Sequence, residues 1–292
     1  MKYKSNLFYN RVAEKYEDTR FKTKDGKLYA EITWSNIKRF LPKKGSLILD
    51  AGGGTGFFAR KLAKLGYKVV LTDIAENMLE TAEKLARREG LQSKIEFIFS
   101  DIADMKEFKD NTFDFVFSNK NVVSYCPKPE KAIKELRRVA KKGAYVYIEV
   151  NGFFRELNFL IGKRDFKGIE KLVKTQHIDL NGFDQYCFMV EELEDLFREN
   201  CLKIVDISSR NFILCGLDDK TRNEILGNPK AYRIIRGLEF KFNRNPYFIG
   251  TGSIRIVGKK WLNERRKVKS IHRSCLVYDQ STHINRKAVK DF

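Results

Sequence analysis

Short apolar runs alternate with amphipathic segments along the first half of the chain. Each run ends in a polar residue, as the strands of a buried sheet do, and the runs predict strands at 47–49, 68–72, 94–100, 113–118 and 144–150. Helix-forming segments bounded by glycine or proline lie between them, at 57–65, 75–89 and 129–141. This alternation predicts a mostly parallel sheet with right-handed crossovers and helices on both faces.

The flanking regions depart from this alternation. Helices are expected at 5–20 and 29–40, ahead of the first strand. From residue 152 to about 188 many phenylalanines stand among basic residues, which predicts an inserted helical segment over the ligand-facing edge of the sheet. An amphipathic helix is expected at 190–200, followed by a strand at 202–208. A polar, helical segment is expected at 218–236 and a last strand at 252–258. We expect the last two strands to pair antiparallel at one edge.

The stretch LILDAGGGTGFFA, residues 47–59, predicts a strand, a glycine turn and the first turn of a helix. Glycines allow positive φ and a close approach of a ligand to the backbone, and the helix would direct its free N–H groups toward that ligand. No Lys-Ser or Lys-Thr follows the glycines, so a loop that holds a triphosphate is not expected. The stretch therefore predicts a site for a dinucleotide or a nucleoside.

Acidic and amide residues stand at the ends of the predicted strands, where parallel sheets bind ligands. Asp73 can accept two hydrogen bonds from a ribose diol, which both NAD and S-adenosylmethionine carry. Asp101 can accept from the exocyclic amine of adenine, and the backbone N–H of Ile102 can donate to a ring nitrogen. Ile74 and Met78 are expected either to cover the adenine face or to form ordinary helix core.

Four motifs follow one another along the chain: DAGGGTG (50–56), LTDIAENMLETA (71–82), FSDIADM (99–105) and FDFVFSNKNVVSY (113–125). In this order they resemble the class I S-adenosylmethionine-dependent methyltransferases, in particular the type 11, or ubiquinone/menaquinone-biosynthesis-like, group. The segments RVAEKYED (11–18) and PEKAIKELRRVAKKGAYVYIEV (129–150) fit the same group. The sequence departs from it in having AKKGAY where KPGG is common, and in continuing beyond the last strand.

The resemblance implies a role for each matching residue. Gly52, Gly53 and Gly54 would underlie the methionine part of the cofactor, and Asp50 would orient it. Asp73 would bind the ribose, while Asp101 and Ile102 would bind the adenine. Further contacts are expected from the backbone around Asn119 to the methionine amino group, and from Tyr16, which would close over that end.

The expected fold is thus α/β: a Rossmann-like seven-stranded sheet, mostly parallel with an antiparallel last strand, with helices on both faces, a helical lid and a basic C-terminal extension. Residues 1–44 are expected to cover the cofactor site, 45–261 to form the methyltransferase domain with its lid at about 152–188, and 262–292 to form a basic tail. The tail has eight basic and three acidic residues.

The most informative feature of the composition is the net positive charge. The 292 residues carry a net charge of +19, which allows attraction to RNA or acidic surfaces but also fits a lysine-rich, solvated surface. The five cysteines are widely spaced and include no CxxC pair, so neither a zinc site nor a disulfide framework is expected. Reduced thiols, the lack of a signal-peptide pattern at the first residues and the lack of a long apolar run predict a cytoplasmic protein.

The resemblance implies methyl transfer from S-adenosylmethionine, which leaves S-adenosylhomocysteine, to an acceptor that the sequence does not define. The phenylalanine-rich lid favours a small-molecule or lipid-like acceptor. The charge leaves open a tRNA or rRNA methyltransferase, and a binding module that keeps the fold without catalysis is a further alternative. His177 is a weak candidate for a general base, since a histidine in this segment is more often a surface or lid residue. Tyr186, Tyr125 and Lys120 are candidates for lining the acceptor site.

Overall fold

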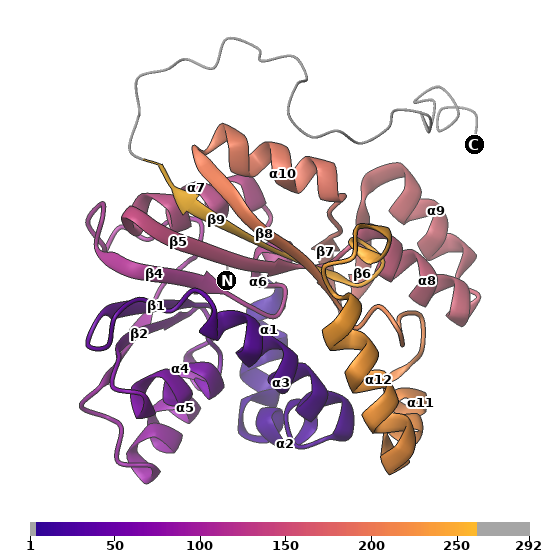
Figure 1. The fold of residues 1–292 in the computed structure, drawn as a ribbon, viewed down its shortest axis with the longest axis horizontal. Coiled ribbons are helices and arrows are strands. Elements are labelled where there is room, and N and C mark those ends of the chain that lie inside the picture. Colours follow the sequence, from indigo (N-terminus) through magenta and orange to yellow (C-terminus); the bar gives the residue numbers. More distant parts are fainter. Residues whose placement is uncertain (1–3, 262–292) are drawn as a thin grey trace. The chain divides into compact units, whose positions relative to one another are not determined.

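The computed structural model describes residues 4–261 (Figure 1). Its main sheet has the strand order β3-β2-β1-β4-β5-β9-β8. The strands are β1 (Leu47–Ala51), β2 (Lys68–Asp73), β3 (Ile95–Phe99), β4 (Phe113–Ser118), β5 (Ala140–Val150), β8 (Leu202–Arg210) and β9 (Ser253–Lys260). The first five pair parallel, and β9 runs antiparallel to both of its neighbours, β5 and β8. The predicted fold class is therefore confirmed, including the antiparallel last strand.

Helices cover both faces of this sheet. Those of the described chain are α1 (Lys4–Val12), α2 (Tyr16–Arg20), α3 (Lys24–Lys38), α4 (Phe57–Lys64), α5 (Glu76–Arg88), α6 (Val122–Tyr125), α7 (Pro129–Val139), α8 (Phe153–Lys163), α9 (Phe166–Thr175), α10 (Val190–Glu199), α11 (Asp219–Gly227) and α12 (Pro229–Phe242). Two short 3₁₀ helices, η1 (Ala13–Lys15) and η2 (Pro246–Phe248), complete the set.

Two cores form because successive strand residues point to opposite faces of the sheet. Ile48 belongs to the core that α3, α4 and α5 cover, whereas Leu49, the next residue, belongs to the core under α7 and α10. Figure 1 shows α4 and α5 on one side of the strands and α7 and α10 on the other. The inner strands β1, β2 and β4 are buried on both faces, which explains why their sequences are nearly continuous apolar runs.

The segment between β5 and α10 differs from the prediction. It was expected to be helical throughout, but α8 and α9 are followed by an antiparallel hairpin of β6 (His177–Leu180) and β7 (Phe183–Tyr186). The two residues of its turn, Asn181 and Gly182, both have positive φ, at 59° and 84°. Asn-Gly is a preferred pair for such tight turns, because both residues tolerate that conformation. The sequence therefore carried a hairpin signal in the middle of the insertion.

Helix boundaries differ from the prediction for local reasons. The expected helix at 5–20 is interrupted by η1, and the expected excursion at 218–236 is two helices, α11 and α12. The break falls at Asn228, whose side chain accepts hydrogen bonds from the N–H groups of Lys230 (2.9 Å) and Ala231 (3.1 Å). Pro229 then occupies the first helical position, where its missing N–H costs nothing.

The predictions for the tail, 262–292, concern residues that lie outside the described part. Within residues 4–261, no helix combines the length and the hydropathy needed to cross a membrane.

Candidate active site

The backbone of the glycine turn after β1 lies close to the end of β2 and to α6. The N–H groups of Gly52 and Gly53 both donate to the Thr72 carbonyl of β2, at 2.8 and 3.0 Å. A Cβ on Gly52, whose φ is +72°, would lie 2.5 Å from a methyl group of Val122, and one on Gly53 would lie 2.8 Å from the Asp50 carboxyl carbon. Only glycine fits these two positions, so the turn keeps an unobstructed backbone beside the pocket.

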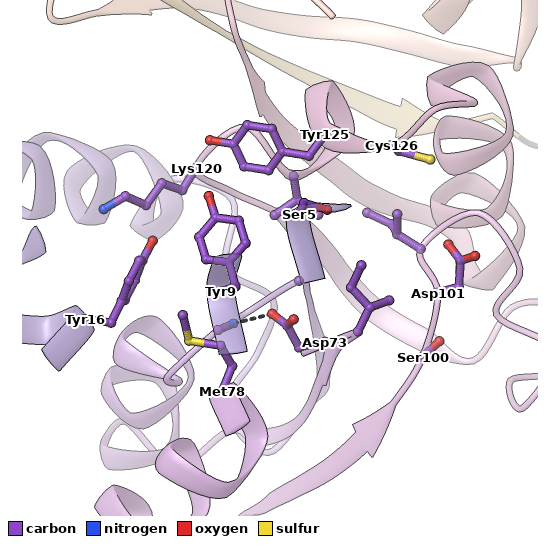
Figure 2. A pocket seen from close by; sticks show the side chains of 15 residues that line it. Ser5, Tyr9, Tyr16, Asp73, Met78, Ser100, Asp101, Lys120, Tyr125 and Cys126 are labelled. Atoms are coloured by element: carbon purple, nitrogen blue, oxygen red, sulfur yellow. Dashed lines mark hydrogen bonds between the residues drawn. The ribbon is translucent and has the colours of Figure 1, made fainter. Parts of the chain in front are cut away.

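The Asp73 carboxylate at the end of β2 is held by the same turn. The Gly54 N–H donates to one of its oxygens and the Ala75 N–H to the other, both at 2.9 Å. Figure 2 shows the Asp73 side chain in the pocket, with the first of these hydrogen bonds as a dashed line. Burial raises the pKa of Asp73, whereas the backbone N–H groups of Ala75, Gly54 and Ile74 lower it. Each oxygen keeps a free lone pair, so the carboxylate can accept two more hydrogen bonds from a ligand.

Asp50, at the end of β1, is 2% exposed and lies near Asp73. Burial raises the pKa of Asp50 well above its usual range, and the negative charge of Asp73 raises it further. A positive charge on a ligand beside the glycine turn would favour the ionised form of this carboxyl. The pair of carboxyl groups thus makes this end of the pocket suitable for a cation.

Asp73 lines a narrow pocket of about 80 Å³ that continues toward the end of β3. At that end it is lined by Ser100, Asp101 and Ile102, with Ile74 and Met78 along its side. The Ser100 hydroxyl is buried and has no hydrogen-bond partner among the described residues. Since buried polar groups are normally paired, this hydroxyl is suited to a polar ligand atom.

Aromatic side chains close the other side of the pocket. Tyr9 of α1 and Tyr16 of α2 line it together with Tyr125 of α6, and Figure 2 shows their rings beside one another. The ring of Tyr9 lies 6.1 Å from that of Tyr16 and 5.9 Å from that of Tyr125. Burial raises the pKa of Tyr16 and of Tyr9, so both remain neutral hydrogen-bond donors. The helices α1 and α2 therefore form a cover over the pocket.

A second, larger cavity of about 830 Å³ adjoins this pocket. The two share the residues Tyr9, Tyr16, Lys120 and Tyr125. The larger cavity extends between the starts of α3 and α11, the helix α8 and the turn of the β6–β7 hairpin. A narrow pocket thus opens beside a roomy polar cavity, a geometry suited to two ligands that react with each other.

Residues 49–148 match the family model described as a methyltransferase domain. The chain carries a class I methyltransferase domain. S-adenosylmethionine is the cofactor of this family, so the cofactor prediction is confirmed at that level.

Curated relatives of the methyltransferase domain act on different acceptors. The tRNA 5-carboxymethoxyuridine methyltransferase of Escherichia coli (strain K12) is 26% identical over 161 residues, which are 53% of this chain and 61% of that protein. The ubiquinone/menaquinone biosynthesis C-methyltransferase of Hydrogenovibrio crunogenus is 33% identical over 113 residues, 36% of this chain and 42% of that protein. The chain thus spans about three fifths of the first relative's length and less than half of the second's.

A solved structure extends the likeness to most of the fold. The complex between the Trm112 methyltransferase activator of Haloferax volcanii and a methyltransferase contains a chain that superposes with a TM-score of 0.57 at 18% identity. The superposition covers 90% of this chain and 100% of that one. It supports the arrangement of strands and helices around the methyltransferase domain.

Most residues singled out in the sequence line the narrow pocket of the methyltransferase domain. These are Tyr16, Gly52, Gly54, Asp73, Ile74, Met78, Asp101 and Ile102. Asp50 and Gly53 lie behind this wall, where they shape the turn. Asn119 is buried and lines neither cavity, and its side-chain amide has no hydrogen-bond partner in the described chain. A role for the Asn119 backbone stays a prediction.

His177 lies away from both cavities. Its ring nitrogen Nδ1 contacts Asp184 on the surface of the β6–β7 hairpin, and its side chain is 35% exposed. Tyr186 donates its hydroxyl hydrogen bond to Glu192 and also lines neither cavity. The geometry therefore gives no support to His177 as a general base. Of the acceptor-site candidates, it places Tyr125 and Lys120 where both cavities meet.

Some pocket residues were not anticipated. Ser5 and Tyr9 line the narrow pocket from α1, although their spacing in the sequence indicated only an ordinary helix. No sequence signal points to them, because the contact that fixes α1 against the start of α5, from the Asn77 N–H to the Asn10 side-chain oxygen at 2.9 Å, joins residues far apart in the chain.

Arg60 ties the cover to the glycine turn. Its guanidinium is nearly buried and contacts Glu17 (2.8 Å), Glu89 (2.8 Å) and the Thr55 carbonyl (2.6 Å). Glu17 follows Tyr16 on α2 and also accepts a hydrogen bond from the Thr55 hydroxyl at 2.9 Å. These contacts thus hold α2, and with it Tyr16, next to the glycine turn.

We expect Arg60→Gln to weaken binding of S-adenosylhomocysteine by roughly tenfold and to lower the free energy of unfolding by about 3 kcal/mol, because Glu17 and Glu89 lose a buried partner. Calorimetric titration and urea unfolding measure the two effects. Arg87→Gln is the matched control, since Arg87 pairs with Glu83 on the exposed surface of α5. Equal behaviour of the two variants would refute the anchoring role of Arg60.

Proposed function

We propose that this protein transfers the methyl group of S-adenosylmethionine to a small-molecule or lipid-like acceptor held in the larger cavity. The observation that supports this most directly is the junction of the two cavities at Tyr9, Tyr16, Lys120 and Tyr125. A cofactor in the narrow pocket and an acceptor in the larger cavity would meet there. We also propose, from the widely spaced cysteines, a cytoplasmic location.

The residues of the narrow pocket fit the parts of the cofactor. Asp73 has two oxygens free to accept from the ribose diol, and Asp101 with the Ile102 N–H would bind adenine. The glycine turn offers the methionine part an open backbone, and Asp50 lies beside it as a counter-charge. When bound, the cofactor supplies a methyl group already activated by the sulfonium.

The protein's own contribution is then position and exclusion of water. The rings of Tyr9, Tyr16 and Tyr125 close the junction, so that reacting atoms would meet away from bulk solvent. A base is needed only for an acceptor that keeps its proton at neutral pH. Neither cavity is lined by a histidine of the described chain, so the geometry favours acceptors that need no strong base.

Incubation with S-adenosylmethionine labelled in its methyl group, together with fractionated cell extract, tests this proposal. We expect label in the small-molecule or lipid fraction, and S-adenosylhomocysteine as the second product. The variant Asp73→Asn serves as the inactive control. Label that enters only RNA or protein would refute the acceptor class, and failure of the protein to bind S-adenosylhomocysteine would refute methyl transfer itself.

A tRNA or rRNA methyltransferase is the second candidate. It is supported by the net charge of +19 and by the likeness to the E. coli enzyme whose name specifies tRNA. RNA binding that weakens steeply with salt would favour it, because such binding releases counterions. A module that binds the cofactor without catalysis would instead give binding and no labelled product.

A further inference from the structure

The larger cavity has an excess of positive charge. Seven of the residues that line it are lysine or arginine, and four are aspartate or glutamate. The acidic residues are already engaged. Asp25 pairs with Arg222 at 3.5 Å, Asp219 pairs with Arg20 at 3.2 Å, and Asp218 caps α11 through the Thr221 N–H at 2.8 Å. Glu156, the fourth, contacts Arg155.

The opposite wall, at the ends of β4 and β8, holds one cation without a carboxylate partner in the described chain and one that shares its partner. Lys120 makes no ion pair with any carboxylate in residues 4–261, and its ammonium lies over the rings of Tyr16, Phe21 and Tyr29 at 4.5 to 5.2 Å. Arg210 lies 4.5 Å from the centre of the Tyr29 ring. Within residues 4–261 its only ion pair is with the buried Glu149, which also pairs with Arg255. Two cations therefore flank one tyrosine ring.

The same tyrosine offers an unused hydrogen-bond donor. Tyr29 lines the larger cavity and is 5% exposed, yet its hydroxyl has no hydrogen-bond partner in the described chain. Burial and the charge of Glu149 raise the pKa of Tyr29 well above its usual value, so the group keeps its proton. An unpaired buried donor between cations is costly unless a ligand satisfies it.

The pKa values of two basic side chains show how closely positive charges are gathered in this cavity. Burial, followed by the charges of Arg20 and Arg210, lowers the pKa of Lys120 to about 7. Burial and the charges of Arg210 and Arg222 lower the pKa of Arg155 to about 10.

The backbone at Lys120 is unusual as well. Lys120 has a positive φ of 58°, and the next residue, Asn121, has one of 66°. A pair of left-handed non-glycine residues is an uncommon conformation that is concentrated at functional sites.

We propose that the methyl acceptor carries a carboxylate or phosphate group that binds against Lys120, Arg210 and the Tyr29 hydroxyl. This inference rests on the proposed function, because it identifies the class of molecule that the larger cavity admits. Charge-assisted hydrogen bonds from lysine, arginine and tyrosine match the oxygens of such a group. The cavity volume of about 830 Å³ lies within the range of small-molecule sites. Anchored there, the acceptor would extend its reactive atom toward the junction at Tyr16 and Tyr125.

Calorimetric titration of the full-length protein tests the anchor without knowledge of the acceptor. Inorganic phosphate and succinate are titrated separately at constant ionic strength, with and without saturating S-adenosylhomocysteine. We expect saturable binding of at least one anion in both conditions, and the tighter of the two identifies the charged group. Absence of saturable binding by both anions would overturn the proposal.

Two variants localise the binding. Tyr29→Phe removes only the hydroxyl and is expected to weaken anion binding roughly tenfold, while S-adenosylhomocysteine affinity stays within about twofold. Lys120→Met is expected to weaken it at least as much. The matched control is Lys163→Met, which removes the same charge from an exposed position of this cavity, where Lys163 lies over Phe159. Equal losses of anion affinity in Lys120→Met and Lys163→Met would show that the anion responds only to the overall positive charge of the cavity. That result would overturn the proposed anion site.

Further outcomes separate this proposal from others. Competition between the anion and S-adenosylhomocysteine would show that Lys120, Arg210 and Tyr29 bind the carboxylate of the cofactor. That result would also overturn the proposed acceptor site. Displacement of the anion by a short RNA at lower concentration than by succinate would assign the wall to RNA. Failure of the wild-type protein to bind S-adenosylhomocysteine, with anion binding intact, would refute the proposed function and leave the anion site standing.

Discussion

Asp73→Asn should lower the affinity for S-adenosylhomocysteine by about 100-fold, the loss expected for one hydrogen bond to a charged group. The two carboxylate oxygens accept from the N–H groups of Gly54 and Ala75, at 2.9 Å each. An amide has only one acceptor oxygen. In either orientation its NH₂ group would face one of these backbone donors, and one hydroxyl of the ribose would lose its acceptor. Calorimetric titration measures the loss directly.

The control for this prediction is Asp184→Asn, the same substitution on the exposed hairpin, where Asp184 pairs with Lys171 at 2.8 Å. Its affinity for S-adenosylhomocysteine should equal that of the wild type. Urea unfolding of both variants separates a loss of ligand contacts from a loss of folding. Retention of wild-type affinity by Asp73→Asn would show that the ribose lies elsewhere.

The sheet and much of the narrow pocket could be predicted because their signals are local. A strand buried on both faces needs an apolar run, and a turn with positive φ or close backbone contact needs glycine, as at Gly52 and Gly53. Parallel strands also deliver their carboxyl ends to one edge. For that reason Asp73 and Asp101, which are 28 positions apart, line the same pocket.

The larger cavity could not be predicted in this way, because its wall is assembled from distant segments. Lys120, Arg155 and Arg210 belong to three different parts of the chain, and only Lys120 stands in one of the motifs, at 113–125. Nor does the sequence show that Asp25, Asp218 and Asp219 are occupied by nearby groups and so do not pair with Lys120. Charge balance within a cavity depends on tertiary neighbours, whereas net charge alone only indicates a basic protein.

The choice of His177 as a base shows the same limit. A histidine in a segment expected to cover the sheet edge is a reasonable candidate, since its ordinary pKa lies near neutrality. The hairpin that the Asn181–Gly182 turn produces instead pairs β6 with β7 and places His177 opposite Tyr186, next to Asp184. The position of His177 follows from this turn, which the sequence-based prediction missed, because the strand register decides which side chains face the cavity.

Glu149→Gln should lower the free energy of unfolding by about 3–5 kcal/mol, because it leaves buried arginines without a counter-charge. Glu149 of β5 is fully buried between Arg255 of β9 (2.9 Å) and Arg210 of β8 (3.2 Å). The two arginines lower the pKa of Glu149 despite the opposing effect of burial, so the group is ionised in the folded protein. Its carboxylate thus joins the three strands that form the antiparallel edge of the sheet.

Urea unfolding of Glu149→Gln and of the control Glu83→Gln tests this. Glu83 pairs with Arg87 on the exposed surface of α5, where such a pair contributes about 0.5 kcal/mol. A loss below about 1 kcal/mol in Glu149→Gln would show that water reaches the buried arginines. The same variant links stability to the proposed anion site, because Arg210 borders both the ion cluster and the larger cavity. With Glu149 neutral, Arg210 keeps its full charge toward the cavity, so folded Glu149→Gln should bind inorganic phosphate more tightly than the wild type does.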